Sequence, residues 1–221
     1  MMKLEDFRLV VTAGPTREWL DPVRFITNAS SGKTGWHIAS LGLKRFREVV
    51  YISGPGDPRY AKVEGARCLR VDSTEDMSRA VNENTGDDTV LIMTAAPADY
   101  TPANVAENKI KKSPEGLLRL ELRPTTDILK TLSEHTADAR NCIKVGFAAE
   151  TNDLEANAQG KLERKGLHFI CANQVYRDSA GFGDNDNTWR VFGRDGSETV
   201  LGPAPKEDLA GMLLDLLARE I

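Results

Sequence analysis

The run FRLVVT at residues 7–12, which ends at the turn AGP of residues 13–15, decides the fold class of this chain. A short apolar run that stops at a Gly-Pro pair is typical of a strand buried on both faces of a sheet. Similar runs recur at residues 48–52, 89–93, 142–147 and 167–171. Stretches of helical periodicity lie between them, at residues 35–46, 74–81, 126–132 and 153–165. Strands that alternate with helices predict an α/β fold with a doubly wound, mostly parallel sheet.

The pattern changes after residue 173. The runs 189–192 and 199–201 flank the sequence GRDG, which predicts a β-hairpin, and residues 206–220 carry leucine at helical spacing. We therefore expect a small C-terminal β-hairpin, a candidate dimerisation element, followed by a closing helix. No flexible linker interrupts the chain, so residues 1–221 are expected to form a single domain. Residues 97–114 lack clear periodicity, and loops of this length are usually functional or mobile.

Composition excludes several classes of function. The 29 Lys and Arg and 33 Asp and Glu residues give a net charge of −4, which offers no general attraction to nucleic acid or to an anionic membrane. No apolar run approaches the roughly 20 residues that span a bilayer. Neither a zinc-ligand spacing nor a serine-nucleophile motif is present. The cysteines Cys68, Cys142 and Cys171 read as free thiols, which suit a reducing compartment, so we expect a soluble cytoplasmic protein.

The run TNASSGKTG at residues 27–35 contains the Gly-Lys-Thr that closes a phosphate-binding P-loop. A true P-loop needs glycine five residues before Gly32, where this chain has Thr27. Small residues, hydroxyls and free N–H groups at a helix start still favour an anion site. A serine-capped helix start with glycines for close packing is the alternative. A dinucleotide site fits worse, because the Gly-x-Gly-x-x-Gly pattern is incomplete.

Three further places carry polar groups where ligands of open α/β sheets bind, beyond the carboxyl ends of the strands. Asp99 follows a buried strand and is a candidate for a ribose hydroxyl or a magnesium ion, or for capping a turn. Lys109 leads a lysine-rich loop that either closes over a polyphosphate or is simply solvated. Asn28 has an amide that donates and accepts hydrogen bonds; an Asx turn is its alternative role.

Taken in order, blocks along nearly the whole chain resemble the phosphopantothenoylcysteine synthetase family, in its stand-alone bacterial form. The matching blocks are VTAGPTRE (11–18), DPVRFITNASSGKTG (21–35), SGP (53–55), MTAAPADY (93–100), ENKIKK (107–112), TTDIL (125–129), VGFAAET (145–151), KLERKGLHFICAN (161–173) and GFGDNDN (181–187).

The resemblance implies a Rossmann-like fold, a homodimer and a ligase of coenzyme A biosynthesis. The carboxylate of 4'-phosphopantothenate would attack the α-phosphorus of CTP with Mg²⁺ present, and the amine of cysteine would then displace CMP from the acyl-cytidylate. Mg²⁺ is expected to be held mainly by the triphosphate, with Asp99 as a candidate ligand. Many bacterial relatives carry a flavin-dependent decarboxylase as a first half; for this chain we expect no flavin.

The resemblance also assigns roles by motif position. Asn28 corresponds to the residue that serves the second step, and Lys109 to the lysine of the first step. Ala95 and Ala96 correspond to the lining of the intermediate's pocket. The expected nucleotide-binding residues are Gly14, Ser31, Gly32, Gly35, Asp99, Phe147, Lys161 and Lys165. Because Lys161 and Lys165 are four residues apart, we expect them to share one helix face as two phosphate contacts.

This chain departs from the family pattern at Pro15, Thr34 and Pro97, where glycine, methionine and valine are usual. Proline fixes φ and has no N–H, so we expect fewer backbone donors at the turns that contain Pro15 and Pro97. Two alternatives remain at this point: a nicotinamide-dependent oxidoreductase on the same fold, and a nucleotide-binding protein without turnover.

Overall fold

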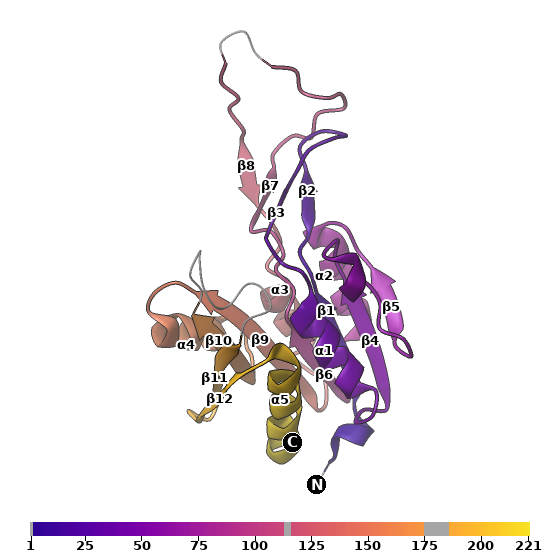
Figure 1. Cartoon of the computed structure of the whole chain (residues 1–221), viewed down its shortest axis with the longest axis vertical. Coiled ribbons are helices and arrows are strands. Elements are labelled where there is room, and N and C mark those ends of the chain that lie inside the picture. The colour runs from indigo at the N-terminus through magenta and orange to yellow at the C-terminus, as the bar shows by residue number, and fades with distance from the viewer. Residues whose placement is uncertain (1, 113–115, 175–185) are drawn as a thin grey trace.

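The computed structural model describes residues 2–112, 116–174 and 186–221. Its centre is an eight-stranded sheet in the order β12-β11-β10-β9-β6-β1-β4-β5 (Figure 1). The strands are β1 (Arg8–Ala13), β4 (Glu48–Ser53), β5 (Arg67–Arg70), β6 (Thr89–Met93), β9 (Cys142–Glu150), β10 (Phe169–Gln174), β11 (Asn187–Gly193) and β12 (Glu198–Ala204). The predicted fold class, an α/β fold with a mostly parallel sheet, is confirmed.

Strand order reverses beside β1. The chain runs outward from β1 through β4 to β5, then returns to the other side of β1 with β6 and continues through β9 and β10. All of these pairings are parallel, and Val10 on β1 faces both Val50 and Leu91 across the ladders. Since ligands of such sheets bind where the strand order reverses, the segments that follow β1 and β6 define where a site belongs.

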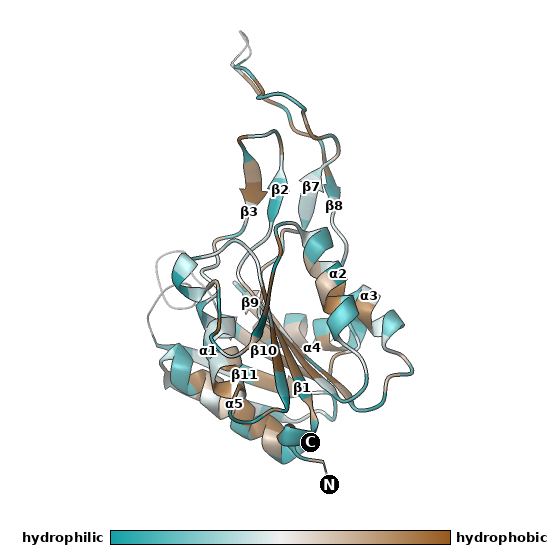
Figure 2. Cartoon of the chain, turned by 90° about the vertical axis from the view of Figure 1, so that its right-hand side faces the viewer, coloured by the Kyte–Doolittle hydropathy of each residue, from teal (hydrophilic) through white to brown (hydrophobic). Residues whose placement is uncertain are grey.

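Helices cover both faces of the sheet, which explains why its central strands are apolar throughout. Helices α1 (Lys33–Gly42) and α5 (Lys206–Glu220) pack on one face, in a cluster with Leu9 and Tyr51. Helices α2 (Thr74–Asn84), α3 (Ile128–His135) and α4 (Leu154–Arg164) pack on the other face, with Val10 and Leu91. Figure 2 shows the apolar residues concentrated in the strands and on the inner sides of the helices.

Helix ends largely follow the sequence signals. Ser73 caps α2 through a capping box with Asp76, and Asp127 accepts a hydrogen bond from Lys130 N at the start of α3. In α4 the predicted narrow stripe is present, with Ala158 and Leu162 buried. No helix among the described residues is long and apolar enough to cross a membrane.

The predicted C-terminal hairpin is β11 and β12, but it is not a separate small element. β11 pairs antiparallel with β10, so the hairpin extends the main sheet at one edge. The residues of the GFGDNDN motif lie mostly outside the described residues, as do residues 113–115.

Two short ladders stand outside the main sheet and were not predicted. They pair β2 (Arg17–Trp19) with β3 (Phe25–Thr27) and β7 (Tyr100–Pro102) with β8 (Leu122–Pro124). We call the described residues within 17–27 and 100–124 the arm, because these segments project together from the body (Figure 1). The arm carries large apolar side chains that are between 40% and 72% exposed: Val23, Tyr100, Val105, Leu117, Leu118, Leu120 and Leu122.

Candidate functional site

A cavity of about 580 Å³ opens at the reversal of strand order, over the ends of β1 and β6 and the start of α1. It is lined by residues 29–35, Arg59, Tyr60, Thr94, Ala95, Ala96, Asp99, Phe147, Ala148, Ala149, Lys161, Asn173 and Lys206. The structure thus brings together most of the predicted site residues. The predicted residues outside this lining are Gly14, Asn28, Lys109 and Lys165.

Helix α1 begins at the cavity without a side-chain cap. Its N-cap is Gly32, with φ of +84°, a left-handed conformation that disfavours any residue with a Cβ. Ser31 Oγ accepts a 3.3 Å hydrogen bond from Lys33 N but is not the N-cap. The alternative of a serine N-cap is therefore wrong, because the N-cap of α1 is Gly32. Backbone N–H groups at the positive end of a helix face an open cavity, which suits an anion.

Gly35 lets α1 approach the strand ends closely. A Cβ at this position would lie 2.5 Å from Thr94 Oγ1 and 2.7 Å from the Cβ of Ala13. Gly14 lies beneath the helix start, since a Cβ on Gly32 would come within 3.2 Å of Gly14 N. Gly14 therefore supports the cavity floor from below.

Hydrogen bonds from both side chain and backbone join the segments that leave β1 and β6. Thr94 Oγ1 donates to Thr12 O at 2.7 Å, and Ala96 N donates to Gly14 O at 2.9 Å. Pro15 forms an isolated parallel bridge with Ala96, so the missing N–H of Pro15 does not break this pairing. Ala95 and Ala96 are thereby held in the cavity wall, where small side chains let a ligand approach the backbone.

Asn28 sits at the rim of the cavity. Its Nδ2 donates to the carbonyl oxygens of Ala96 and Pro97 at 3.3 Å and 3.0 Å. These bonds fix the amide against the small-residue wall and use both of its N–H donors, which leaves the oxygen Oδ1 as its acceptor. The asparagine amide thus lies beside the residues predicted to hold the intermediate.

Lys161 and Lys165 do not line the same cavity, contrary to the expected pair of phosphate contacts. Lys161 lies in α4, lines the large cavity and pairs with Glu150 at 2.6 Å. Lys165 is the C-cap of α4, outside the last helical turn, and pairs with Asp127 at 3.3 Å.

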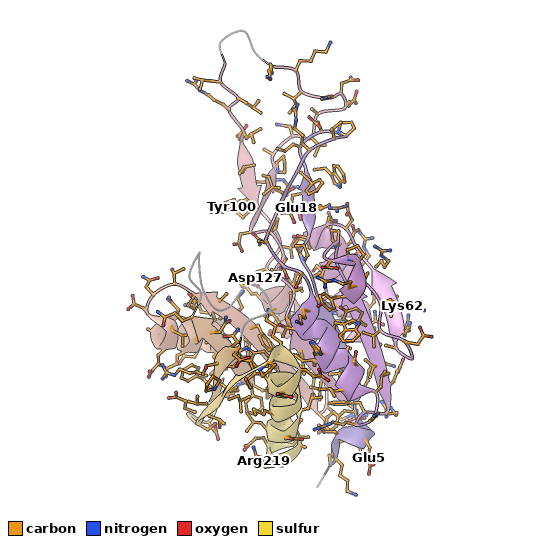
Figure 3. The ribbon with its side chains drawn as sticks, viewed as in Figure 1. Glu5, Glu18, Lys62, Tyr100, Asp127 and Arg219 are labelled. Atoms are coloured by element: carbon orange, nitrogen blue, oxygen red, sulfur yellow. The ribbon has the colours of Figure 1, made fainter. Side chains whose placement is uncertain are left out.

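A second cavity, of about 260 Å³, adjoins the first at Asp99, which lines both. Its remaining lining residues are Met93, Pro97, Ala98, Thr125, Thr126, Asp127, Ile128, Leu129 and Lys165. This space lies at the start of α3, where Figure 3 labels Asp127. Asp99 therefore stands at the junction of a larger and a smaller compartment.

Lys109 lies on the arm, between β7 and β8, and not in the cavity. Its neighbour Ile110 is attached to the β2–β3 turn: Ile110 N donates to Asp21 Oδ2 at 3.0 Å, and Arg24 donates to Ile110 O at 2.9 Å. Burial would raise the pKa of the Asp21 carboxyl, but N–H donors from Ile110, Val23 and Arg24, with the Arg24 charge, lower it overall. Asp21 thus stays ionised and holds the Lys109 segment to the arm.

The base of the arm is fixed by a buried carboxylate. Glu18 accepts hydrogen bonds from Thr74 N at 2.9 Å and from Thr74 Oγ1 at 2.8 Å, at the start of α2. Figure 3 labels Glu18 and Tyr100 at this base. The arm therefore leaves the body from an anchored origin.

Several lining residues escaped sequence reasoning: Arg59, Tyr60, Asn173 and Lys206. Asn173 lies near the carboxyl end of β10, so the strand-end rule would have found it. Arg59 and Tyr60 lie in a 3-10 helix after β4, and Lys206 starts the last helix, distant in sequence from every motif. Nothing in the local sequence indicates that these residues reach the cavity.

Among the described residues, the lining of the large cavity contains one carboxylate, Asp99, and four cationic side chains, Lys33, Arg59, Lys161 and Lys206. Among the described residues no group of three or more His, Cys, Asp or Glu side chains is placed to hold a metal ion. A single carboxylate fits a magnesium ion bound mainly by substrate phosphates, since Mg²⁺ usually takes one or two carboxylates besides phosphates and water.

Comparisons with known proteins agree with this architecture. The family described as "DNA/pantothenate metabolism flavoprotein C-terminal domain" matches residues 4–221. The coenzyme A biosynthesis bifunctional protein CoaBC of Bacillus subtilis is 42% identical over 97% of this chain and 52% of its own length. The chain thus spans about half the length of the curated relatives it matches.

Solved structures agree at the level of the fold. The C-terminal domain of a CoaBC protein superposes with a TM-score of 0.77 and 35% identity, covering 98% of this chain and 96% of that domain. A Cab2 mutant solved with phosphopantothenate-cysteine is 16% identical and shares the fold, with a TM-score of 0.73 over 98% of this chain and 87% of its own. The chain therefore belongs to the DNA/pantothenate metabolism flavoprotein C-terminal domain family.

Proposed function

We propose that this domain joins 4'-phosphopantothenate to cysteine in two steps. In the first, the pantothenate carboxylate oxygen attacks the α-phosphorus of CTP, the bond from that phosphorus to the bridging oxygen breaks, and pyrophosphate leaves. In the second, the cysteine amine attacks the acyl carbon of the resulting acyl-cytidylate. A C–N bond forms, the amine loses a proton, and CMP leaves.

One observation carries this proposal: the helix start and the small-residue wall line a single cavity at the reversal of strand order, and the Asn28 amide is hydrogen-bonded to that wall. An ionised carboxylate is a poor electrophile, so it must be activated as a mixed anhydride. Such chemistry needs an anion site for phosphate beside a close-fitting wall for the acyl group. The sequence resemblance and the family membership support the same reaction.

For the first step, we assign the phosphates to the start of α1, where Ser31, Gly32 and Gly35 line the cavity. We assign the nucleoside to the region around Asp99. Phe147 and Lys161 flank the phosphates. Phe147 packs edge-on against Trp189, with ring centroids 5.0 Å apart. Mg²⁺, held mainly by the triphosphate with Asp99 as its candidate protein ligand, would offset phosphate charge when bound. The reaction itself calls for no flavin.

For the second step, Asn28 provides a hydrogen-bond acceptor for the cysteine amine. With its Nδ2 engaged by the Ala96 and Pro97 carbonyls, Asn28 Oδ1 is the group that can hold the incoming amine of cysteine against the acyl carbon. An amide neither adds nor removes a proton, so its role is to position the amine.

We propose a homodimer formed through the arm. The arm exposes seven large apolar side chains, and a concentration of exposed apolar residues in a soluble protein marks an interaction surface. A homodimer also explains why Lys109 lies on the arm while its own cavity lacks it, because a partner's arm can carry Lys109 to that cavity. There its ammonium would neutralise phosphate charge in the first step. Free cysteine and CTP are cytoplasmic substrates, so we place the reaction in the cytoplasm.

The proposal is tested by pyrophosphate release from purified protein with Mg²⁺ and phosphopantothenate, comparing CTP with ATP, with and without cysteine. Product mass identifies the ligation. We expect phosphopantothenoylcysteine only when cysteine is present, with CTP preferred. A folded dimer that binds CTP and forms no product would instead indicate a nucleotide-binding protein without turnover.

A further inference from the structure

Lys144 on β9 lies outside every sequence block that resembles the ligase family, yet it carries a buried ammonium group. The residue is only 7% exposed, and its Nζ donates to two hydroxyl oxygens, Ser133 Oγ at 3.1 Å and Thr136 Oγ1 at 3.3 Å. Burial is the main reason why the pKa of this ammonium is lowered. The charge therefore requires compensation from its surroundings.

The two hydroxyl partners of Lys144 connect its ammonium to the carboxyl ends of α3 and α4. Ser133 Oγ donates to the carbonyl oxygen of Lys165, the C-cap of α4, at 2.6 Å. Thr136 is the C-cap of α3, and its Oγ1 donates to Leu132 O at 2.8 Å. Because the carbonyl groups at the end of a helix carry partial negative charge, a cation is favoured there. One ammonium thus lies at the negative ends of two helices.

The chain that follows Lys165 leaves room for this contact. Gly166 has a φ of +57°, and its N–H donates to Glu163 O at 3.1 Å, as in a helix that ends on a left-handed glycine. A Cβ on Gly166 would lie 3.0 Å from Ser133 Oγ. Glycine at this position therefore both ends α4 and lets Ser133 approach the Lys165 carbonyl.

Lys165 connects this arrangement to the second cavity. Its carbonyl is held by Ser133 near the end of α3, and its ammonium pairs at 3.3 Å with Asp127, the N-cap of α3. Lys165 and Asp127 both line the second cavity, together with Asp99. Since residue 165 is attached near both ends of α3, the position of α3 against the end of α4 fixes this part of the cavity wall.

We propose that Lys144 is a positioning residue for nucleoside binding: by joining the ends of α3 and α4, it holds Lys165 and Asp127 in the cavity wall beside Asp99. This inference rests on the proposed function, which places the nucleoside around Asp99 and the phosphates at the start of α1. Lys144 itself lines neither cavity. Its loss should therefore weaken every ligand that carries the nucleoside and spare a ligand that is only phosphate.

The test measures binding of CTP, CMP and inorganic pyrophosphate by calorimetry with Mg²⁺, for the wild type, Lys144→Met and Ser133→Ala. Methionine keeps the apolar stem without the ammonium, and alanine removes the hydroxyl that contacts Lys165 O. In both variants we expect affinity for CTP and for CMP to fall about threefold to tenfold, the usual net contribution of one hydrogen bond, with affinity for pyrophosphate unchanged. Ser133→Ala provides the test if Lys144→Met fails to fold.

Thr136→Val is the matched control, because it removes the other hydroxyl partner of Lys144, which donates to Leu132 O and not to Lys165 O. It should lower the melting temperature and leave all three affinities unchanged. A purely structural role of Lys144 predicts instead that Ser133→Ala and Thr136→Val behave alike. Lys130→Met removes an exposed cation from α3 and should also change no affinity.

Three results would each overturn the role of Lys144: equal weakening of CTP and pyrophosphate by Lys144→Met, equal weakening of CTP by Ser133→Ala and Thr136→Val, or unchanged affinity for CTP and CMP in both test variants. A wild type that binds no CTP would overturn this role together with the proposed function. Because binding needs no phosphopantothenate, a wild type that binds CTP yet forms no phosphopantothenoylcysteine would contradict the proposed function alone.

Discussion

The cavity and the arm hold their functional residues in different ways. Cavity residues follow buried parallel strands and are locked by backbone contacts, such as Ala96 N to Gly14 O and the close approach of Gly35 to Thr94. The Lys109 segment instead depends on Asp21 and its neighbours in a projecting arm with many exposed apolar side chains. Under the proposed function, the body provides a preformed binding site, and the arm, which is mounted separately, supplies Lys109.

The largest expected effect comes from placing a defective Asn28 and a defective Lys109 in different subunits of one dimer. We expect Asn28→Ala and Lys109→Ala homodimers each to form almost no phosphopantothenoylcysteine. If Lys109 serves the partner's cavity, a heterodimer of the two variants contains one site with both native residues and should work at about half the wild-type rate. The measurement is product formation by heterodimers purified through two different tags.

Doubly tagged Lys109→Ala homodimers are the control for the tags and should stay inactive. A heterodimer as inactive as its parents would show that Lys109 acts within its own subunit. That outcome would leave the arm as an interface but remove its catalytic contribution to the partner.

Gly35→Ala tests whether the cavity is preformed by close packing. The added methyl group would lie 2.5 Å from Thr94 Oγ1, so α1 must shift outward. We expect a loss of about 1–3 kcal/mol in the free energy of unfolding, and weaker CTP binding. Gly86→Ala is the control, because a Cβ there has no neighbour within 4 Å. Equal stability of the two variants in chemical denaturation would contradict the packing argument.

Asp21→Asn tests the attachment of the Lys109 segment to the arm. We expect the ligation rate to fall about tenfold to a hundredfold through misplacement of Lys109, and the melting temperature to fall because a buried, hydrogen-bonded carboxylate is lost, with CTP affinity nearly unchanged. The pKa of the Asp21 carboxyl is lowered in the folded state. Its ionised form therefore contributes its full stabilisation of the folded state above about pH 4, and this stabilisation is lost as pH falls through the lowered pKa. Asp138→Asn, at an exposed position away from the arm, should have no effect. A large fall in CTP affinity would mean that Asp21 supports the cavity instead.

The smallest expected effect concerns His168, at the end of the sheet opposite the cavity. Burial, with the charges of Arg194 and Lys144, lowers the pKa of His168 to about 4. The unfolded chain binds this proton near pH 6.5, so stability should decline as pH falls from about 6.5 to about 4. His168→Asn keeps an acceptor for Lys144 N, which donates to His168 Nδ1 at 3.1 Å, and should flatten this decline. His135→Asn, at an exposed site, should leave the dependence of melting temperature on pH unchanged.

The same contrast explains what the sequence could predict. The strands of the body are apolar because helices cover both faces, so β1, β4, β6, β9 and β10 were recognisable as runs. The arm strands are three residues each and only partly buried, so they have no apolar run or clear alternation. Edge strand β5, RCLR, was missed for the same reason.

Site residues followed a similar rule. Residues at a helix start or in the segment that follows a strand, such as Gly32 and Asp99, could be located by motif and position. Lys206 could not, since only the packing of α5 beside α1 brings it to the cavity. Lys161 and Lys165 line two adjoining cavities and not one: Lys165 is the C-cap at which α4 ends, and it pairs with Asp127.

The most direct test of the two-step account uses Asn28→Ala with CTP, Mg²⁺ and phosphopantothenate, followed by mass spectrometry of the bound and released products. We predict near-normal pyrophosphate release in the first turnover and accumulation of the acyl-cytidylate, which persists when cysteine is added. Loss of pyrophosphate release to the same extent as loss of phosphopantothenoylcysteine would contradict the assignment of Asn28 to the second step and, with it, the division of labour between cavity and arm.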